Sequence, residues 1–99
     1  MKIYEGTREN HTALVTVNGT PLNPRLDLRS HSSTGFEWGY GGSGPAQLAL
    51  AIVSDHLCDD RKATELYQQF KWAVVANLPA MRWRLDAEEI QAVVAGLVS

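Results

Sequence analysis

The stretch GFEWGYGGSGPAQLALA, residues 35–51, decides the fold because the chain changes character within it. Phe36, Trp38 and Tyr40 stand at every second position, which is the period of a β-strand with one aromatic face. Pro45 suits the first position of a helix, and the following residues are apolar on all sides, as in a buried helix. We therefore expect an aromatic strand that turns sharply at the glycines into a central helix ending near Cys58.

Upstream of this stretch, the sequence indicates a small antiparallel sheet. A short strand at Ile3 and Tyr4 ends at Gly6, and residues 13–17, ALVTV, are rich in β-branched side chains. Asn18 and Gly19 favour a two-residue hairpin turn, although Pro21 confines the return arm to an edge of the sheet. The polar residues 23–34 predict a loop with at most one short strand.

Downstream, the spacing of apolar residues becomes helical. Asp59 or Asp60 can cap a second helix that continues until Pro79 stops it, and Asp86 with Glu89 forms the capping box of a third. The sequence thus predicts one α+β domain over residues 1–99. Its small antiparallel N-terminal sheet, a hairpin plus the aromatic strand, precedes three helices and packs on the central one.

Composition excludes several classes of protein. The chain has 99 residues and a net charge of -2 with interspersed signs, so it lacks the basic footprint of a typical nucleic-acid-binding domain. Its single cysteine cannot form an internal disulfide, which favours a reducing compartment, and we expect a cytoplasmic protein. No apolar run approaches the roughly 18 residues that span a bilayer.

The glycine-rich segment invites a phosphate-binding interpretation that is incomplete. Residues 39–44 match G-x-G-x-x-G, but no parallel strand or ribose-binding acid follows, and no lysine completes a P-loop. A weaker alternative is an anion site at the amides of Gly41, Gly42, Ser43 and Gly44, at the start of the helix. The competing interpretation is architectural: these glycines allow a sharp turn and close packing.

Other chemistry-bearing residues do not form a catalytic constellation. His56, Cys58, Asp59 and Asp60 are close in sequence, but on a helix positions two apart face different ways, so we expect no metal site. No residue stands out as catalytic and no cofactor is implied, so we expect a protein that is not an enzyme.

Two surface hypotheses remain. Arg82 and Arg84, with Lys71, could contact nucleic acid, while Trp83 between the arginines would face the core. Trp72 falls off the apolar stripe of the second helix, and an exposed tryptophan there would be an anchor for a protein partner.

Residues 35–45, together with Gln47 and the apolar run after it, resemble the signature of a family of small bacterial, archaeal, phage and plasmid proteins without an assigned activity. The resemblance extends to residues 4–6, 66–67 and 70–71. It brings no catalytic or binding residue. It implies a setting in which small proteins bind a host protein, for example as inhibitors of CRISPR and other defence systems. The leading hypothesis is therefore a non-enzymatic module that binds a host protein, with no membrane association.

Overall fold

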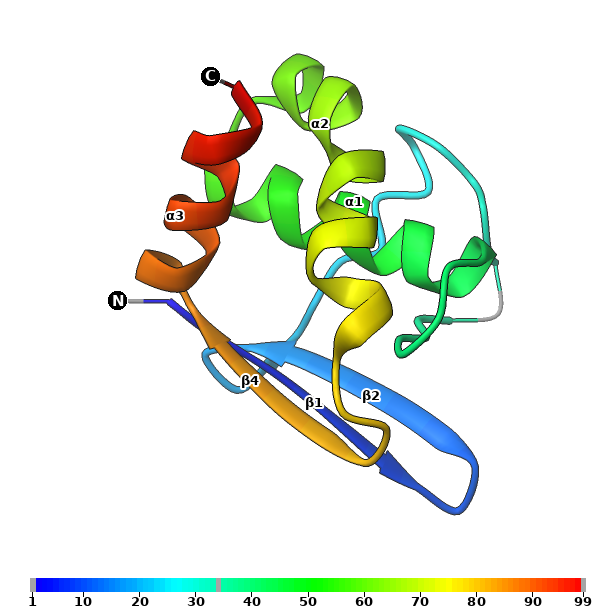
Figure 1. Ribbon diagram of the computed structural model, residues 1–99. Coiled ribbons are helices and arrows are strands. Elements are labelled where there is room, and N and C mark those ends of the chain that lie inside the picture. The colour runs from blue at the N-terminus through cyan, green and yellow to red at the C-terminus, as the bar shows by residue number, and fades with distance from the viewer. Residues whose placement is uncertain (1, 34, 99) are drawn as a thin grey trace.

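The computed structural model describes residues 2–33 and 35–98, and it shows an α+β fold with a four-stranded antiparallel sheet and three α-helices (Figure 1). Residues 1, 34 and 99, including the last residue of the predicted 23–34 loop, lie outside the described residues. The strands are β1 (Ile3–Glu9), β2 (Thr12–Val17), β3 (Thr20–Pro21) and β4 (Arg82–Asp86). The helices are α1 (Ser43–Leu57), α2 (Asp60–Ala73), the short 3-10 helix η1 (Val75–Asn77) and α3 (Ala87–Val98).

The N-terminal sheet confirms the predicted hairpin and extends it. Asn18 and Gly19 have φ values of 50° and 82°, the positive values that a tight two-residue turn requires, and they join β2 to β3. A second tight turn, with positive φ at Asn10 and His11, joins β1 to β2. The first strand therefore continues to Glu9, three residues beyond the predicted end at Gly6.

The predicted aromatic strand is wrong. Residues 35–42 form no strand, and the place beside β1 is taken by β4, so the sheet order is β3-β2-β1-β4. Gly35 and Gly39 have positive φ values of 133° and 88°, which interrupt an extended chain. Trp38 is buried while Tyr40 is exposed, so the aromatics do not share one buried face. Residues 23–33 also form no strand.

The helices cover one face of the sheet and leave the other to solvent (Figure 1). Tyr4, Val15 and Trp83 point from three neighbouring strands into the core. Arg82 and Arg84 stand on the opposite, exposed face, which confirms the expected alternation around Trp83. All residues of α1 from Gly44 to Ser54 are buried, so the predicted central helix forms the middle of the core.

The helix boundaries follow the predicted signals, with two differences. The Asp59 carboxylate accepts a hydrogen bond from the Lys62 amide, and Asp86 and Glu89 form the reciprocal capping box of α3 at 2.8 and 3.0 Å. Pro45 is the third residue of α1, since the helix begins at Ser43. The second helix ends at Ala73, and η1 fills the interval before Pro79.

Candidate functional site

The glycine-rich segment is held in place by contacts that need the glycines. Gly39 donates its amide to the Val75 carbonyl at 3.0 Å, which joins the segment to η1. A Cβ at Gly44 would lie 2.6 Å from Cβ of Glu37, closer than side chains can approach, so Gly44 lets residue 37 pack on the start of α1. Most of this segment is therefore architecture.

Trp38 and Glu37 lock the same segment to the sheet. Trp38 donates its indole hydrogen to the Pro79 and Ala80 carbonyls at 2.9 and 3.0 Å, and its ring packs edge-on against Trp83. The Arg8 guanidinium stacks 4.6 Å from the Trp38 ring centroid and forms a two-pronged ion pair with Glu37 at 2.8 and 3.0 Å. This hydrogen-bonded ion pair raises the pKa of Arg8 above its usual value.

The first turn of α1 has no internal cap. Gly42 is the N-cap residue and offers no side chain, and the first amide bonded within the helix is that of Ala46. Within residues 2–33 and 35–98, the amides of Gly41, Gly42, Ser43 and Gly44 have no hydrogen-bond acceptor. The anion-binding interpretation therefore keeps one supporting feature, and it stays a prediction.

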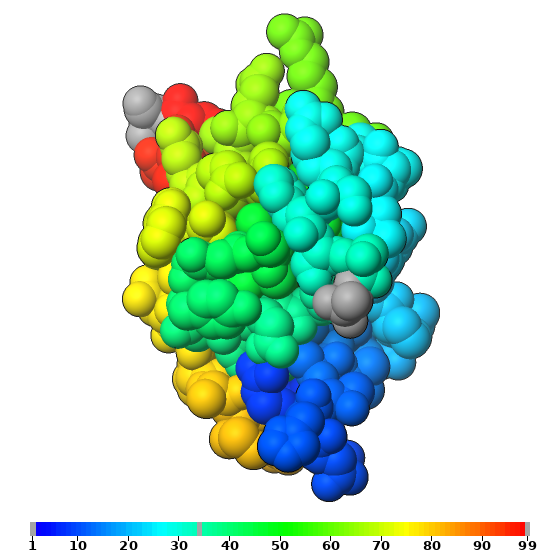
Figure 2. All heavy atoms as spheres, turned by 90° about the vertical axis from the view of Figure 1, so that its right-hand side faces the viewer, coloured from blue at the N-terminus to red at the C-terminus, as the bar shows by residue number. Residues whose placement is uncertain are grey.

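Two exposed aromatic side chains cover this turn. The Trp72 ring lies on Gly41, so closely that a Cβ there would overlap the ring, and the Tyr40 ring lies on Gly42. Trp72 remains 60% exposed and Tyr40 53% exposed, which confirms the expectation that Trp72 is a surface residue. We call Tyr40, Gly41, Gly42, Lys71 and Trp72 the aromatic patch. Figure 2 shows the glycine-rich segment, in green, beside the yellow C-terminal part of α2.

Lys71 belongs to this patch through its ammonium group. The residue is only 8% exposed, and Nζ lies 4.6 Å from the centroid of the Trp72 ring, a cation–π contact. No carboxylate among the described residues pairs with it. The structure therefore brings Lys71 and Trp72 to Gly41 and Gly42, two groups of residues that sequence reasoning treated as separate sites.

Arg82 and Arg84 lie elsewhere. They stand on the exposed face of β4, where their cross-strand neighbours on β1 are Thr7 and Glu5. Lys71 has a buried stem and contacts Trp72, so it contributes little to the exposed surface that carries the two arginines. The three basic residues of the nucleic-acid hypothesis thus belong to different parts of the molecule.

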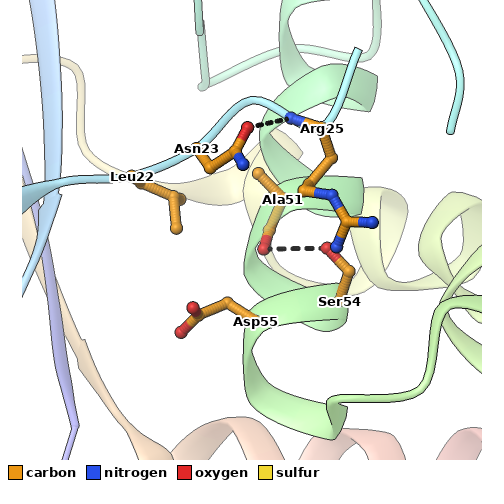
Figure 3. Close-up of a pocket in the computed structure, with 6 residues that line it drawn as sticks. All are labelled: Leu22, Asn23, Arg25, Ala51, Ser54 and Asp55. Atoms are coloured by element: carbon orange, nitrogen blue, oxygen red, sulfur yellow. Dashed lines mark hydrogen bonds between the residues drawn. The ribbon is translucent and has the colours of Figure 1, made fainter. Parts of the chain in front are cut away.

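A small polar cavity that sequence reasoning missed lies between α1 and the chain leaving β3 (Figure 3). Its volume is about 180 Å³, and it is lined by Leu22, Asn23, Arg25, Ala51, Ser54 and Asp55. The Asp55 carboxylate accepts hydrogen bonds from the buried Tyr4 hydroxyl at 2.5 Å and from the Lys2 ammonium at 3.0 Å. Burial, and then this bond to Asp55, raise the pKa of Tyr4 well above its usual value.

The charges around this cavity are paired within the fold. The Arg25 guanidinium binds Asp60 at 2.8 and 3.0 Å and Asp27 at 3.1 Å. These bonds raise the pKa of Arg25 and lower those of Asp27 and Asp60. No sequence motif predicts this cluster of Arg25, Asp27 and Asp60, because Asp60 is 35 positions from Arg25. Since both cavity charges already have partners, the cavity carries no evident chemistry.

The residues considered as metal ligands are dispersed. His56 bonds Gln91 of α3 at 2.7 Å, Asp59 caps α2 and Asp60 pairs with Arg25, while Cys58 is exposed at the end of α1. Within the described part of the chain, no three acidic, histidine or cysteine side chains are placed to hold a metal ion. The same residues include no helix long and apolar enough to cross a membrane.

Comparison with known proteins places the chain in a family. The model of DUF6166, a family of unknown function, matches residues 4–96, so the chain belongs to that family. Searches of curated proteins and of solved structures found no match.

Proposed function

We propose that this protein is a non-enzymatic binding module that contacts a partner protein through the aromatic patch. The main support is the position of Trp72, the larger of the two exposed rings of the patch. This ring is held between Gly41 and the Lys71 ammonium, yet Trp72 is 60% exposed. Covering such a ring would contribute about 3 kcal/mol of hydrophobic free energy. Tryptophan and tyrosine are the side chains that most often anchor protein interfaces.

Rigidity of the patch supports this proposal. A side chain that is already held in one orientation loses little conformational entropy on binding. Trp72 and Tyr40 each rest on a glycine, so neither ring can turn inward without displacing backbone. Gly39, bonded to Val75, ties the turn itself to η1.

The resemblance to phage and plasmid proteins suggests the setting of this binding. We infer a host protein in the cytoplasm as the partner, with a defence system such as CRISPR as the first class to examine. Inhibition by occlusion would need only a stable surface contact, which fits a chain without a catalytic constellation.

The test is comparative capture from the host with three forms of the tagged protein. We expect a partner that is retained by the wild type and by Leu14→Ala, and lost with Trp72→Ala. Leu14 is a suitable control because it is 52% exposed on β2, outside the aromatic patch. Thermal unfolding of each variant verifies that the fold is intact. Equal capture by all three forms would exclude Trp72 as the anchor.

The alternative is an anionic small molecule or nucleotide bound at Gly41–Gly44, where the amides lack acceptors among the described residues. A thermal-shift series with phosphate and with nucleotides separates the two functions. Stabilisation that increases with ligand concentration, and that Trp72→Ala retains, would favour the alternative.

A further inference from the structure

The strand β4 forms one edge of the sheet, and no strand within residues 2–33 and 35–98 lies on its outer side. The hydrogen bonds from the Arg8 amide to the Met81 carbonyl and from the Ala87 amide to the Lys2 carbonyl fix the pattern of the ladder between β1 and β4. In an antiparallel ladder, hydrogen-bonded pairs alternate with pairs whose backbone groups point away from the partner. Trp83 and Leu85 therefore bond to β1, and the backbone N–H and C=O groups of Arg82 and Arg84 point outward.

The two edges of the sheet differ. At the far edge, β3 has only two residues, and one of them is Pro21, which has no amide hydrogen to donate. The β4 edge has no proline, and it offers two amides and two carbonyls in an extended conformation. In Figure 1, β4 lies at the outside of the sheet, and none of the labelled helices and strands runs along its free side.

The side chains beside this edge are basic. Arg82 and Arg84 are exposed on the open face of the sheet, and neither has an ion-pair partner within residues 2–33 and 35–98. Two acidic residues share this face, Glu5 opposite Arg84 on β1 and Asp86 at the end of β4, and neither makes an ion pair with Arg84; the Asp86 carboxylate accepts from the Glu89 amide. A strand added to β4 would place alternate side chains next to the two arginines.

This charge pattern opposes pairing between two copies of the chain. Antiparallel pairing of β4 with itself about Arg84 sets the two Arg84 side chains together and Arg82 against Asp86, and the neighbouring register sets Arg82 against Arg84. A pair of an arginine with Asp86 is disfavoured in any register, because the Asp86 amide already donates to Glu89 and α3 begins at Ala87. A second copy is therefore a poor occupant of this edge.

We propose that the free edge of β4 binds an extended acidic segment of a partner protein as an additional strand. Up to four backbone hydrogen bonds with Arg82 and Arg84 hold the segment, and its alternate carboxylates pair with the two guanidinium groups. Strand addition of this kind takes affinity from the main chain and specificity from alternate side chains. The inference rests on the proposed binding function only in needing a protein partner, since the edge shares no residue with the aromatic patch.

The experiment uses the isotope-labelled full chain and three synthetic peptides. The first is Thr-Glu-Val-Glu-Val-Glu-Thr with blocked ends, the second has lysine in place of glutamate, and the third has N-methylglutamate in place of glutamate. We expect the acidic peptide alone to shift the amide resonances of Arg82 and Arg84 and to slow their hydrogen exchange. The N-methylated peptide keeps the charge but lacks the glutamate amide hydrogens, which are the ones that face Arg82 and Arg84 in an antiparallel pairing, so it tests for the backbone bonds.

Variants separate the edge from general charge attraction. We expect Arg84→Glu to weaken binding of the acidic peptide about tenfold, because one favourable charge contact becomes unfavourable. Arg61→Glu makes the same change of net charge at a side chain that is 91% exposed on α2, and we expect no loss of binding. Arg84→Gln, which adds no negative charge, replaces Arg84→Glu if that variant fails to fold. Trp72→Ala should bind the peptide normally, so the edge and the aromatic patch can fail independently.

Several outcomes would overturn strand addition. These are equal binding of the lysine peptide or the N-methylated peptide, resonance shifts confined to other elements, an equal loss in Arg61→Glu, and no binding of the acidic peptide at the highest attainable concentration. Concentration-dependent dimerisation through β4, observed by sedimentation and abolished in Arg84→Glu, would assign the edge to a second copy instead.

Discussion

Replacing Gln47 by leucine should destabilise the protein more than any surface change, because one buried amide group holds the long loop onto α1. Gln47 is 0% exposed. Its Nε2 donates to the Pro24 carbonyl at 2.5 Å and to the Arg29 carbonyl at 3.0 Å, and its Oε1 accepts from the His31 amide at 2.7 Å and the Ser32 amide at 3.2 Å. All four side-chain bonds would be lost together.

The size of the effect follows from these bonds. At a net value of about 1 kcal/mol for each bond, the loss is about 4 kcal/mol, and partial rehydration of the half-exposed loop reduces it to about 3 kcal/mol. This is a large part of the roughly 5–15 kcal/mol by which a small domain is stable. With an m-value of about 1.5 kcal/mol/M, the urea midpoint of Gln47→Leu should fall by roughly 2 M.

Urea unfolding followed by tryptophan fluorescence measures this midpoint, and hydrogen exchange of the His31 amide reports the loop directly. Gln69→Leu is the matched control, since Gln69 is exposed on α2 and its side chain makes no hydrogen bond to any residue that the structure describes. We expect that control to stay within about 0.5 kcal/mol of the wild type. A Gln47→Leu protein with an unchanged midpoint and a still-protected His31 amide would refute the reasoning.

The remaining predictions concern packing and acid stability. Gly44→Ala should lower the free energy of unfolding by about 1–3 kcal/mol, because the new Cβ would meet Glu37 at 2.6 Å. Gly96→Ala on α3 should raise that free energy by about 0.5–1 kcal/mol, because the new Cβ would meet nothing within 4 Å and alanine favours a helix more than glycine does. Urea unfolding measures both changes in the free energy of unfolding. Two changes of the same sign would contradict the packing argument. The pKa values of Asp27 and Asp60 are lowered by the hydrogen bonds from Arg25. Their stabilising effect is therefore complete above the ordinary aspartate pKa of about 4 and is lost as the pH falls through the lowered values. Arg25→Gln should flatten the acid side of the profile of melting temperature against pH, and a profile parallel to that of the wild type would show that the ion pairs contribute nothing.

Local signals predicted the elements whose cause is local. The Asn18 and Gly19 turn, the Asp59 cap and the Asp86–Glu89 box each depend on groups a few residues apart, and the structure contains all three. The alternation of aromatics at residues 36–40 led to a wrong prediction of a strand. It has the period of a strand, but no segment of the described chain pairs with these residues as a strand. A strand exists only when another chain segment supplies hydrogen bonds, and β4 supplies them to β1 instead.

The candidate site was predicted only in its parts. The exposure of Trp72 could be predicted from its position off the apolar stripe of α2, and the glycines indicated close packing. That Trp72 lies on Gly41 could not be read, because these residues are 31 positions apart and meet only when α2 packs beside α1. The outward direction of the Arg82 and Arg84 backbone groups likewise depends on the register between β1 and β4.

The sequence by itself determined an α+β chain with a tight N-terminal hairpin, a buried central helix and two capped helices, because propensity, capping and turn chemistry act over a few residues. Tertiary structure alone decided what the glycine-rich segment does. Glu37 packs on Gly44, Tyr40 on Gly42 and Trp72 on Gly41, at distances that depend on how the segments pack. The aromatic residues lie outside the sheet, and β4, from the C-terminal part of the chain, lies beside β1 instead. Contacts between distant segments depend on the geometry of the assembled core, and no local pattern encodes that geometry.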